Sequence, residues 1–120
     1  MIDHVGFEVI DLACTARFYD AVFHALGARR LHQSAQAVAY GINGPLVWFV
    51  VRGRPAGPGY GHLALQASGK VAVDAAHAAG VAGGGSDDGV PGQRPRYGRR
   101  YYAGYLRDPD GLRVEVVSRR

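Results

Sequence analysis

The sequence predicts an α+β fold made of two similar halves. Apolar and polar residues alternate over residues 2–10 and again over residues 62–67, which is typical of a strand with one buried face. Each of these strands is followed by apolar residues three and four positions apart, which indicate a helix, and then by two further strand candidates. The 120 residues, 48% of them hydrophobic, are expected to form one domain, with module one at about 1–53 and module two at about 60–118.

Local signals predict the elements of the first module. Asp11 can accept hydrogen bonds from the unpaired N–H groups of a helix that begins directly after it. Strands are expected at residues 37–42 and 46–51, and the Asn43-Gly44-Pro45 turn between them predicts an antiparallel hairpin. Residues 52–60 are rich in Gly and Pro and are expected to link the two modules.

The second module repeats this order. A helix is expected at residues 70–79, where a following glycine ends it, and strands are expected at 101–107 and 112–118. The turn between these strands is Asp108-Pro109-Asp110-Gly111, in which Pro and Gly suit the positions of a tight turn. Residues 83–100 have few apolar side chains and many glycines, prolines and charges, so they predict a long mobile loop.

Composition and charge limit the classes of partner and the location expected for this protein. The net charge of +4 comes mainly from arginine, which gathers in residues 94–100 and at Arg119-Arg120. Such a cluster can attract an anion or nucleic acid, but no nucleic-acid-binding motif accompanies it, so a solvated basic loop and no nucleic-acid partner are expected.

The longest apolar run, residues 46–51, is too short to cross a bilayer, and no secretory signal is visible, so a cytoplasmic protein without membrane contact is expected. Cys14 is the only cysteine, which excludes an internal disulfide.

The duplication brings chemically useful residues into equivalent places. His4-Val5-Gly6-Phe7-Glu8 aligns with His62-Leu63-Ala64-Leu65-Gln66, so each first strand carries a histidine and then an acid or amide on the same face. Placing the last strand of module one over that of module two without gaps puts Phe49 opposite Glu115. Glu115 stands in an apolar strand, where an unpaired carboxylate would be costly to bury.

This combination of motifs resembles the vicinal oxygen chelate superfamily, to which glyoxalases, bleomycin-resistance proteins and extradiol dioxygenases belong. The segments that carry the resemblance are His4-Val5-Gly6-Phe7, Arg17-Phe18-Tyr19, His62-Leu63-Ala64-Leu65, Asp108-Pro109-Asp110-Gly111 and Val114-Glu115-Val116. The resemblance implies two tandem βαβββ-type modules that form an incomplete barrel around a central cavity, and a homodimer. It also implies that inward side chains meet in that cavity, which makes His4, His62 and Glu115 the candidate metal ligands.

Two imidazoles and one carboxylate suit divalent iron, manganese, nickel, cobalt or zinc. The predicted protein is glyoxalase- or dioxygenase-like: a metal-dependent lyase, isomerase or dioxygenase that acts on a small oxygen-bearing substrate. The candidate catalytic residues are Glu115 and Tyr101. The side chains expected to line the ligand cavity are Glu8, Phe49, Gln66 and Tyr105. The other histidines, which are expected on the surface, are His24, His32 and His77.

Alternatives to this metal-dependent enzyme stay open. Each histidine could be an ordinary strand residue, and Glu115 could point to water, in which case no metal binds. Phe49 cannot ligate a metal at the place where four-ligand glyoxalases carry Glu or Gln, so glutathione-dependent glyoxalase activity is not expected. An open three-ligand site or a site without metal remains. The alternative function is a metal-free binding protein of the antibiotic-resistance type, which sequesters a hydrophobic ligand in the cavity.

Overall fold

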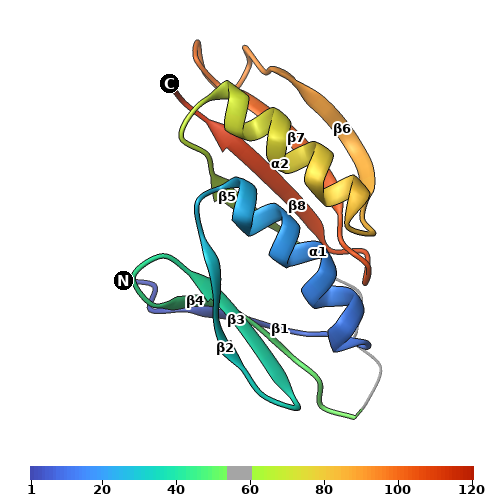
Figure 1. The fold of residues 1–120 in the computed structure, drawn as a ribbon. Helices are drawn as coiled ribbons and strands as arrows, with labels where there is room; N and C mark the ends of the chain where they lie inside the picture. Colours follow the sequence, from blue (N-terminus) through green and yellow to red (C-terminus); the bar gives the residue numbers. More distant parts are fainter. Residues whose placement is uncertain (54–60) are drawn as a thin grey trace.

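The computed structural model describes residues 1–53 and 61–120. The described residues form two four-stranded sheets and two helices, arranged as in Figure 1, and no closed barrel. Module one consists of β1 (Val5–Glu8), α1 (Leu12–Ala25), β2 (Arg29–Gln33), β3 (Ala37–Gly41) and β4 (Pro45–Val50). Module two consists of β5 (His62–Gln66), α2 (Lys70–Ala82), β6 (Ser86–Gln93), β7 (Tyr102–Arg107) and β8 (Arg113–Ser118). The predicted α+β fold of two βαβββ modules is confirmed.

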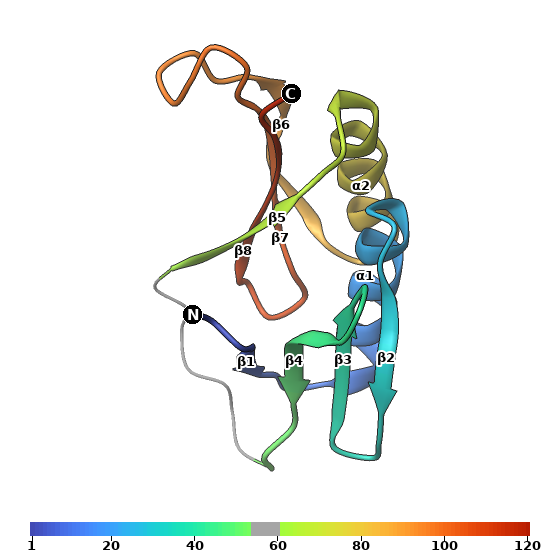
Figure 2. The ribbon, with the colours of Figure 1, turned by 90° about the vertical axis from the view of Figure 1, so that its left-hand side faces the viewer.

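Both sheets have the same strand order, β1-β4-β3-β2 in module one and β5-β8-β7-β6 in module two. The first strand of each module runs parallel to the last, and the other neighbours are antiparallel. The helices pack against each other, and Figure 2 shows both of them on one side of the molecule. Each sheet therefore has one face covered by a helix and one open face. Neither of these helices is long and apolar enough to span a membrane.

Two strands lie where the sequence predicted none. β2 and β6 are the outer strands of their sheets and pair with β3 and β7. β6 covers Ser86–Gln93, so the prediction of a loop over residues 83–100 was wrong there. Gly, Pro and Asp are depleted in strands, but an edge strand pairs on one side only and tolerates them. Pro91 falls in an irregular stretch of the β6–β7 register, between Gly89 and Gly92.

A local sequence signal determines where α1 begins, whereas tertiary packing determines where α2 ends. Asp11 caps α1 as predicted and accepts a hydrogen bond from the N–H of Cys14 at 3.1 Å. α2 continues to Ala82, past Gly80, where the sequence predicted its end. A Cβ atom at Gly80 would lie 2.6 Å from Leu106 Cδ1. This glycine therefore lets α2 lie close to β7 instead of ending the helix.

The hydrophobic core lies between the helices and the covered faces of the sheets. Tyr19 of α1 is fully buried, and its ring stacks on that of Phe49 with 3.9 Å between centroids. Phe23 stacks on Tyr40 of β3 at 4.7 Å. Phe49 is therefore a core residue that fixes α1 on its sheet.

The turn between β7 and β8 ties module two to module one. The hydroxyl of Tyr19 donates to Asp108 Oδ2 at 2.6 Å, and Asp110 Oδ1 accepts the N–H of Ile10 at 3.1 Å. Asp108 Oδ1 also accepts two backbone N–H groups within the turn. Burial raises the pKa of Asp108, and the hydrogen bond from Tyr19 opposes that rise.

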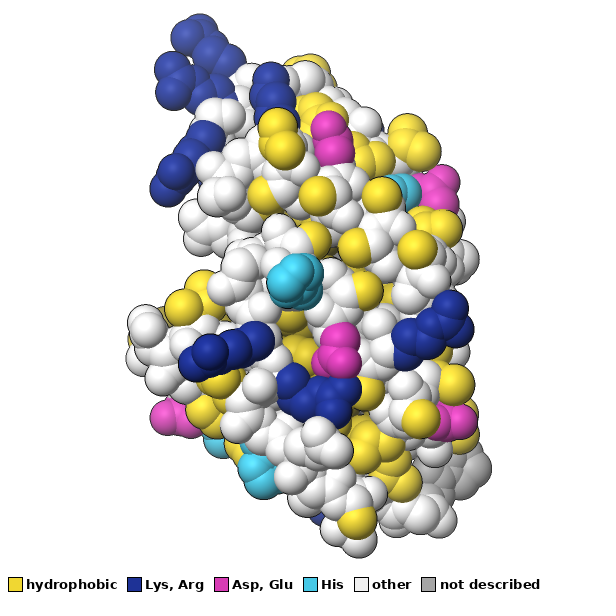
Figure 3. Space-filling model, in the orientation of Figure 1, with side chains coloured by type: hydrophobic (Ala, Val, Ile, Leu, Met, Phe, Trp, Pro, Cys, Tyr) yellow, Lys and Arg dark blue, Asp and Glu magenta, His cyan; other side chains and the backbone are white. Residues whose placement is uncertain are grey.

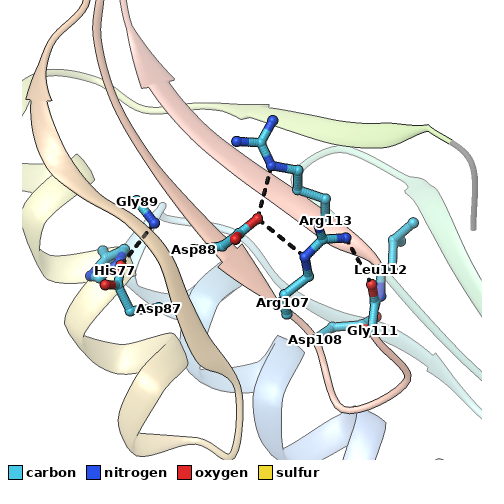
Figure 4. A network of polar contacts seen from close by, with 9 residues as sticks. All are labelled: His77, Asp87, Asp88, Gly89, Arg107, Asp108, Gly111, Leu112 and Arg113. Atoms are coloured by element: carbon cyan, nitrogen blue, oxygen red, sulfur yellow. Dashed lines mark hydrogen bonds and ion pairs between the residues drawn. The ribbon is translucent and has the colours of Figure 1, made fainter.

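Two carboxylates hold β6 against its neighbours (Figure 4). Asp87 Oδ1 lies 2.9 Å from His77 Nε2 of α2. Since His77 is only 8% exposed, its prediction as a surface residue was wrong. The ring can be buried because Asp87 gives its Nε2 atom a polar partner. Asp88 Oδ2 lies 3.1 Å from Arg107 Nε and 2.9 Å from Arg113 Nε. The edge strand is thus fixed to both the helix and the sheet.

Candidate metal and ligand site

The candidate site lies on the open face of module two, where β5 runs beside β8. Ala64 of β5 pairs with Glu115, and Tyr105 of β7 pairs with Glu115 from the other side. Since alternate residues of a strand share a face, His62 lies on the same face as Ala64. The sheet therefore presents His62, Glu115 and Tyr105 together, while the other face of β8 packs in the core.

His62 and Glu115 form the centre of the site. His62 Nε2 lies 3.2 Å from Glu115 Oε1, and Glu115 is only 3% exposed. The hydroxyl of Tyr101 donates a short hydrogen bond to the other oxygen of the carboxylate. Burial and then this hydrogen bond raise the pKa of Tyr101 to about 12. Tyr101 therefore keeps its proton at neutral pH and serves as a hydrogen-bond donor.

An open pocket of about 310 Å³ exposes this cluster to ligands. Its lining residues are His62, Tyr97, Tyr101, Tyr105, Arg113, Glu115 and Arg119. The guanidinium of Arg113 lies 4.0 Å from the ring centroid of Tyr105, and that of Arg119 lies 4.7 Å from the centroid of Tyr101. The pocket thus combines an acid–imidazole pair with aromatic rings and two fixed cations.

His4 lies in the other module, directly before β1. Its Nδ1 is 2.6 Å from Asp3 Oδ1, and its ring meets that of Trp48 edge-on at 6.5 Å. Within residues 1–53 and 61–120, no three His, Cys, Asp or Glu side chains are grouped closely enough to hold a metal. One chain therefore brings together two of the three predicted ligands, His62 and Glu115, and keeps His4 apart from them.

Almost the whole chain matches a single family model. The model of the Glyoxalase/Bleomycin resistance protein/Dioxygenase superfamily matches residues 1–116. This chain belongs to that superfamily. A glyoxalase/bleomycin resistance protein from Albidiferax ferrireducens T118 has a similar crystal structure, with 32% sequence identity, a TM-score of 0.87 and 96% of each chain covered. Among curated proteins, no match was found.

Two other solved structures share the fold of this superfamily member. A glyoxalase-related enzyme from Fulvimarina pelagi is 24% identical with a TM-score of 0.79, over 98% of this chain and 87% of that one. A mutant of glyoxalase I from Zea mays is 22% identical with a TM-score of 0.71, over 95% of this chain and 43% of that one. At these identities the likeness supports the fold alone.

The strand register corrects the predicted alignment of the two modules of this glyoxalase-superfamily chain. Gly6 pairs with Trp48, whereas Ala64 pairs with Glu115. Trp48 is therefore the counterpart of Glu115, and the prediction that Phe49 holds this place was wrong by one residue. A shift of one residue exchanges the two faces of a strand, which is why Phe49 packs in the core. The indole of Trp48 has only an N–H donor and offers no ligand to a metal.

The other residues predicted to line the cavity are dispersed. Glu8 Oε1 lies 3.4 Å from Arg52 Nε, at the end of β1. Gln66 lines a different, mainly apolar pocket of about 360 Å³ between the modules. Phe49 lies in the core, and Tyr105 alone of the four predicted residues lines the pocket of the His62–Glu115 pair.

The sequence prediction missed the two arginines of this pocket. The basic character of residues 94–100 and of the C-terminal residues was visible in the sequence, but it did not indicate where these side chains lie. Arg113 had a usable signal, because it stands two residues before Glu115 on the same strand and therefore on the same face.

Proposed function

We propose that this protein is a divalent-metal-dependent enzyme of lyase, isomerase or dioxygenase type that acts on a small oxygen-bearing substrate. The observation that carries the proposal is the 3.2 Å separation between His62 Nε2 and Glu115 Oε1. Two ligand atoms that each lie about 2.1 Å from one ion, at about 90–109° to each other, are about 3.0–3.4 Å apart. Imidazole and carboxylate together suit iron, manganese, nickel, cobalt or zinc. The pair fits two neighbouring positions of one ion.

The third ligand in this proposal is His4 of a second copy, in a homodimer that brings module one of one chain to module two of the other. Asp3 holds Nδ1 of His4, which directs the lone pair of Nε2 outward. The side chain of His4 is 56% exposed and accessible to a second chain. A site shared between two copies reconciles the predicted three ligands with the two that one chain brings together.

The chain's own residues would orient the substrate and hold the ligands. The chemistry that a bound ion supplies here is to hold substrate oxygens and to stabilise negative charge that develops on them. Tyr101 fixes the Glu115 carboxylate and, with its raised pKa, does not act as a base near pH 7. The rings of Tyr101 and Tyr105 line the pocket and offer apolar surface to a substrate.

The first test is metal binding by the purified protein. After equilibration with nickel, zinc, manganese or iron(II) and gel filtration, we expect about one ion per chain. At a free metal concentration of 100 Kd, the fold should gain about 2.7 kcal/mol, which raises Tm by about 10 °C. His62→Ala and Glu115→Gln should abolish both effects. The control His24→Ala removes an exposed histidine of α1 and should leave both unchanged. A wild-type protein without stoichiometric metal overturns the proposal.

The second candidate function is metal-free ligand binding. Among the described residues, no buried side-chain nitrogen or oxygen lacks a hydrogen-bond partner, so the pair of His62 and Glu115 is satisfied without an ion. Trp48, which cannot ligate a metal, also stands at the place in module one that is equivalent to Glu115. If metal neither binds nor stabilises the protein while a small ligand still does, this function replaces the first.

A further inference from the structure

Arginine side chains lie over tyrosine rings throughout the open face of module two. The pairs, with the distance from guanidinium carbon to ring centroid, are Arg113–Tyr105 at 4.0 Å, Arg119–Tyr101 at 4.7 Å, Arg96–Tyr97 at 4.8 Å and Arg94–Tyr105 at 5.6 Å. Stacking restrains a guanidinium while its N–H edge stays available to a planar acceptor. We call these seven residues the arginine–tyrosine surface.

This surface joins two neighbouring pockets. One is the pocket of about 310 Å³ that contains His62 and Glu115, and the other, of about 440 Å³, lies against β6 and the loop that follows it. Tyr97, Tyr105 and Arg113 line both pockets. A ligand held in the second pocket would therefore lie beside the acid–imidazole pair.

The arginine–tyrosine surface carries more positive than negative charge. Asp88 pairs with Arg107 and Arg113, and Glu115 is occupied by His62 and Tyr101. The other three arginines of the surface make no ion pair with a carboxylate in the described part of the chain; they are Arg94, Arg96 and Arg119. Figure 3 shows Lys and Arg side chains gathered at the end of the molecule that carries the C-terminus. Unneutralised cations beside a pocket attract an anion.

We propose that the arginine–tyrosine surface binds small organic anions that carry a carboxylate or phosphate group, with Arg94 as the principal contact in the larger pocket and Arg119 in the pocket of His62 and Glu115. Arg94 is anchored by Nη2, which donates to the carbonyl of Val90 at 2.8 Å, so its cation is held at the pocket without an acidic partner among the described residues. The identification of this anion as the substrate rests on the proposed function. The binding of the anion does not, because none of the arginines is a metal ligand.

The test is calorimetric titration of the purified full chain with three probes of similar shape: benzoate, phenyl phosphate and neutral benzamide. The two anions should bind at low ionic strength and weaken as salt rises, whereas benzamide should bind at least tenfold more weakly. Arg94→Gln and Arg119→Gln should each weaken anion binding about tenfold, because each removes a charge-assisted hydrogen bond. The ratio of benzoate to phenyl phosphate affinity tells which acid group the surface prefers.

The matched control is Arg29→Gln, which removes the same charge from an exposed position on β2 of the other module. This variant should bind benzoate and phenyl phosphate within twofold of wild type. Equal losses in Arg29→Gln and Arg119→Gln, equal affinity for benzamide and benzoate, or no anion binding would each overturn the proposal.

The same titration in the presence of a chelator, and in His62→Ala, separates this proposal from the metal site. Anion binding that survives both treatments while stoichiometric metal is absent supports the arginine–tyrosine surface and contradicts the proposed metal-dependent function. Metal binding without any anion binding supports the proposed metal-dependent function and contradicts anion binding by the arginine–tyrosine surface.

Discussion

Removing the hydroxyl of Tyr19 should destabilise the fold, because this group joins the two modules. Tyr19 is fully buried, and its hydroxyl donates to Asp108 at 2.6 Å. Hydrogen bonds to charged groups contribute about 1.5–3 kcal/mol, and Tyr19→Phe also leaves one buried carboxylate oxygen without this donor. At about 4 °C per kcal/mol for a chain of this size, Tm should fall by about 6–12 °C.

The assay is urea unfolding followed by the fluorescence of Trp48, the only tryptophan, and by circular dichroism. The matched control is Tyr102→Phe, which removes a hydroxyl that donates to Asp74 at 2.7 Å on the surface and should cost less than about 0.5 kcal/mol. Burial raises the pKa of Asp108, and the hydrogen bond from Tyr19 opposes this rise by stabilising the charged carboxylate, so the loss in Tyr19→Phe should grow as pH rises through that pKa. Equal costs for the two variants would refute the reasoning.

Two further predictions concern the site and the packing. Absorbance titration, taken as wild type minus Tyr101→Phe, should show Tyr101 ionising near pH 12, and Glu115→Gln should lower that pKa by removing an acceptor and a charge. Because the pKa of Tyr101 in the folded state is raised above 10, protonated Tyr101 stabilises the fold fully below pH 10, and this stabilisation is lost as pH rises through about 12. A Tyr101 that titrates at pH 10 contradicts this prediction. Gly85→Ala should cost about 1–3 kcal/mol, because its Cβ would lie 2.2 Å from Phe18 Cε1. Gly44→Ala, with no atom within 4 Å of its Cβ, should cost less than about 0.5 kcal/mol, and equal melting temperatures for these two variants would contradict the packing argument.

Residue alternation predicted the strands that bury one face. Both first strands followed from the patterns at residues 2–10 and 62–67, and the structure places them at Val5–Glu8 and His62–Gln66. β2 and β6 escaped prediction because edge strands in this chain are polar or rich in glycine, and their pairing comes from neighbours far along the sequence. The end of α2 escaped prediction because a contact between Gly80 and Leu106 outweighs the local signal.

The part of the candidate site that lies within one sheet was predictable from the sequence. The duplication indicated His62 and Glu115, and the parallel pairing of β5 with β8 brings them together. The place of His4 depends on how the modules are arranged, which alternation does not encode. The counterpart of Glu115 was misassigned to Phe49 because the alignment compared positions along the chain, whereas the register is set by pairing with the neighbouring strand.

The positions of the arginines also could not be predicted from local sequence patterns. Arg119 follows β8 and lies over Tyr101, and Arg94 follows β6 and lies over Tyr105, because β7 pairs with β8 on one side and with β6 on the other. These contacts join residues that are 18 and 11 positions apart, and both arginines lie beyond the end of a strand, where period-two alternation gives no information.

The most direct test of a metal site shared between two copies is complementation between His4→Ala and His62→Ala. Each variant alone should fold and bind no stoichiometric metal. When the two are refolded together in equal amounts, about half of the dimers are mixed, and each mixed dimer regains one of two intact sites, so metal content should return to about a quarter of the wild-type value. No recovery in the mixture, or wild-type metal content in His4→Ala alone, would contradict a site that takes His4 from one chain and His62 and Glu115 from the other.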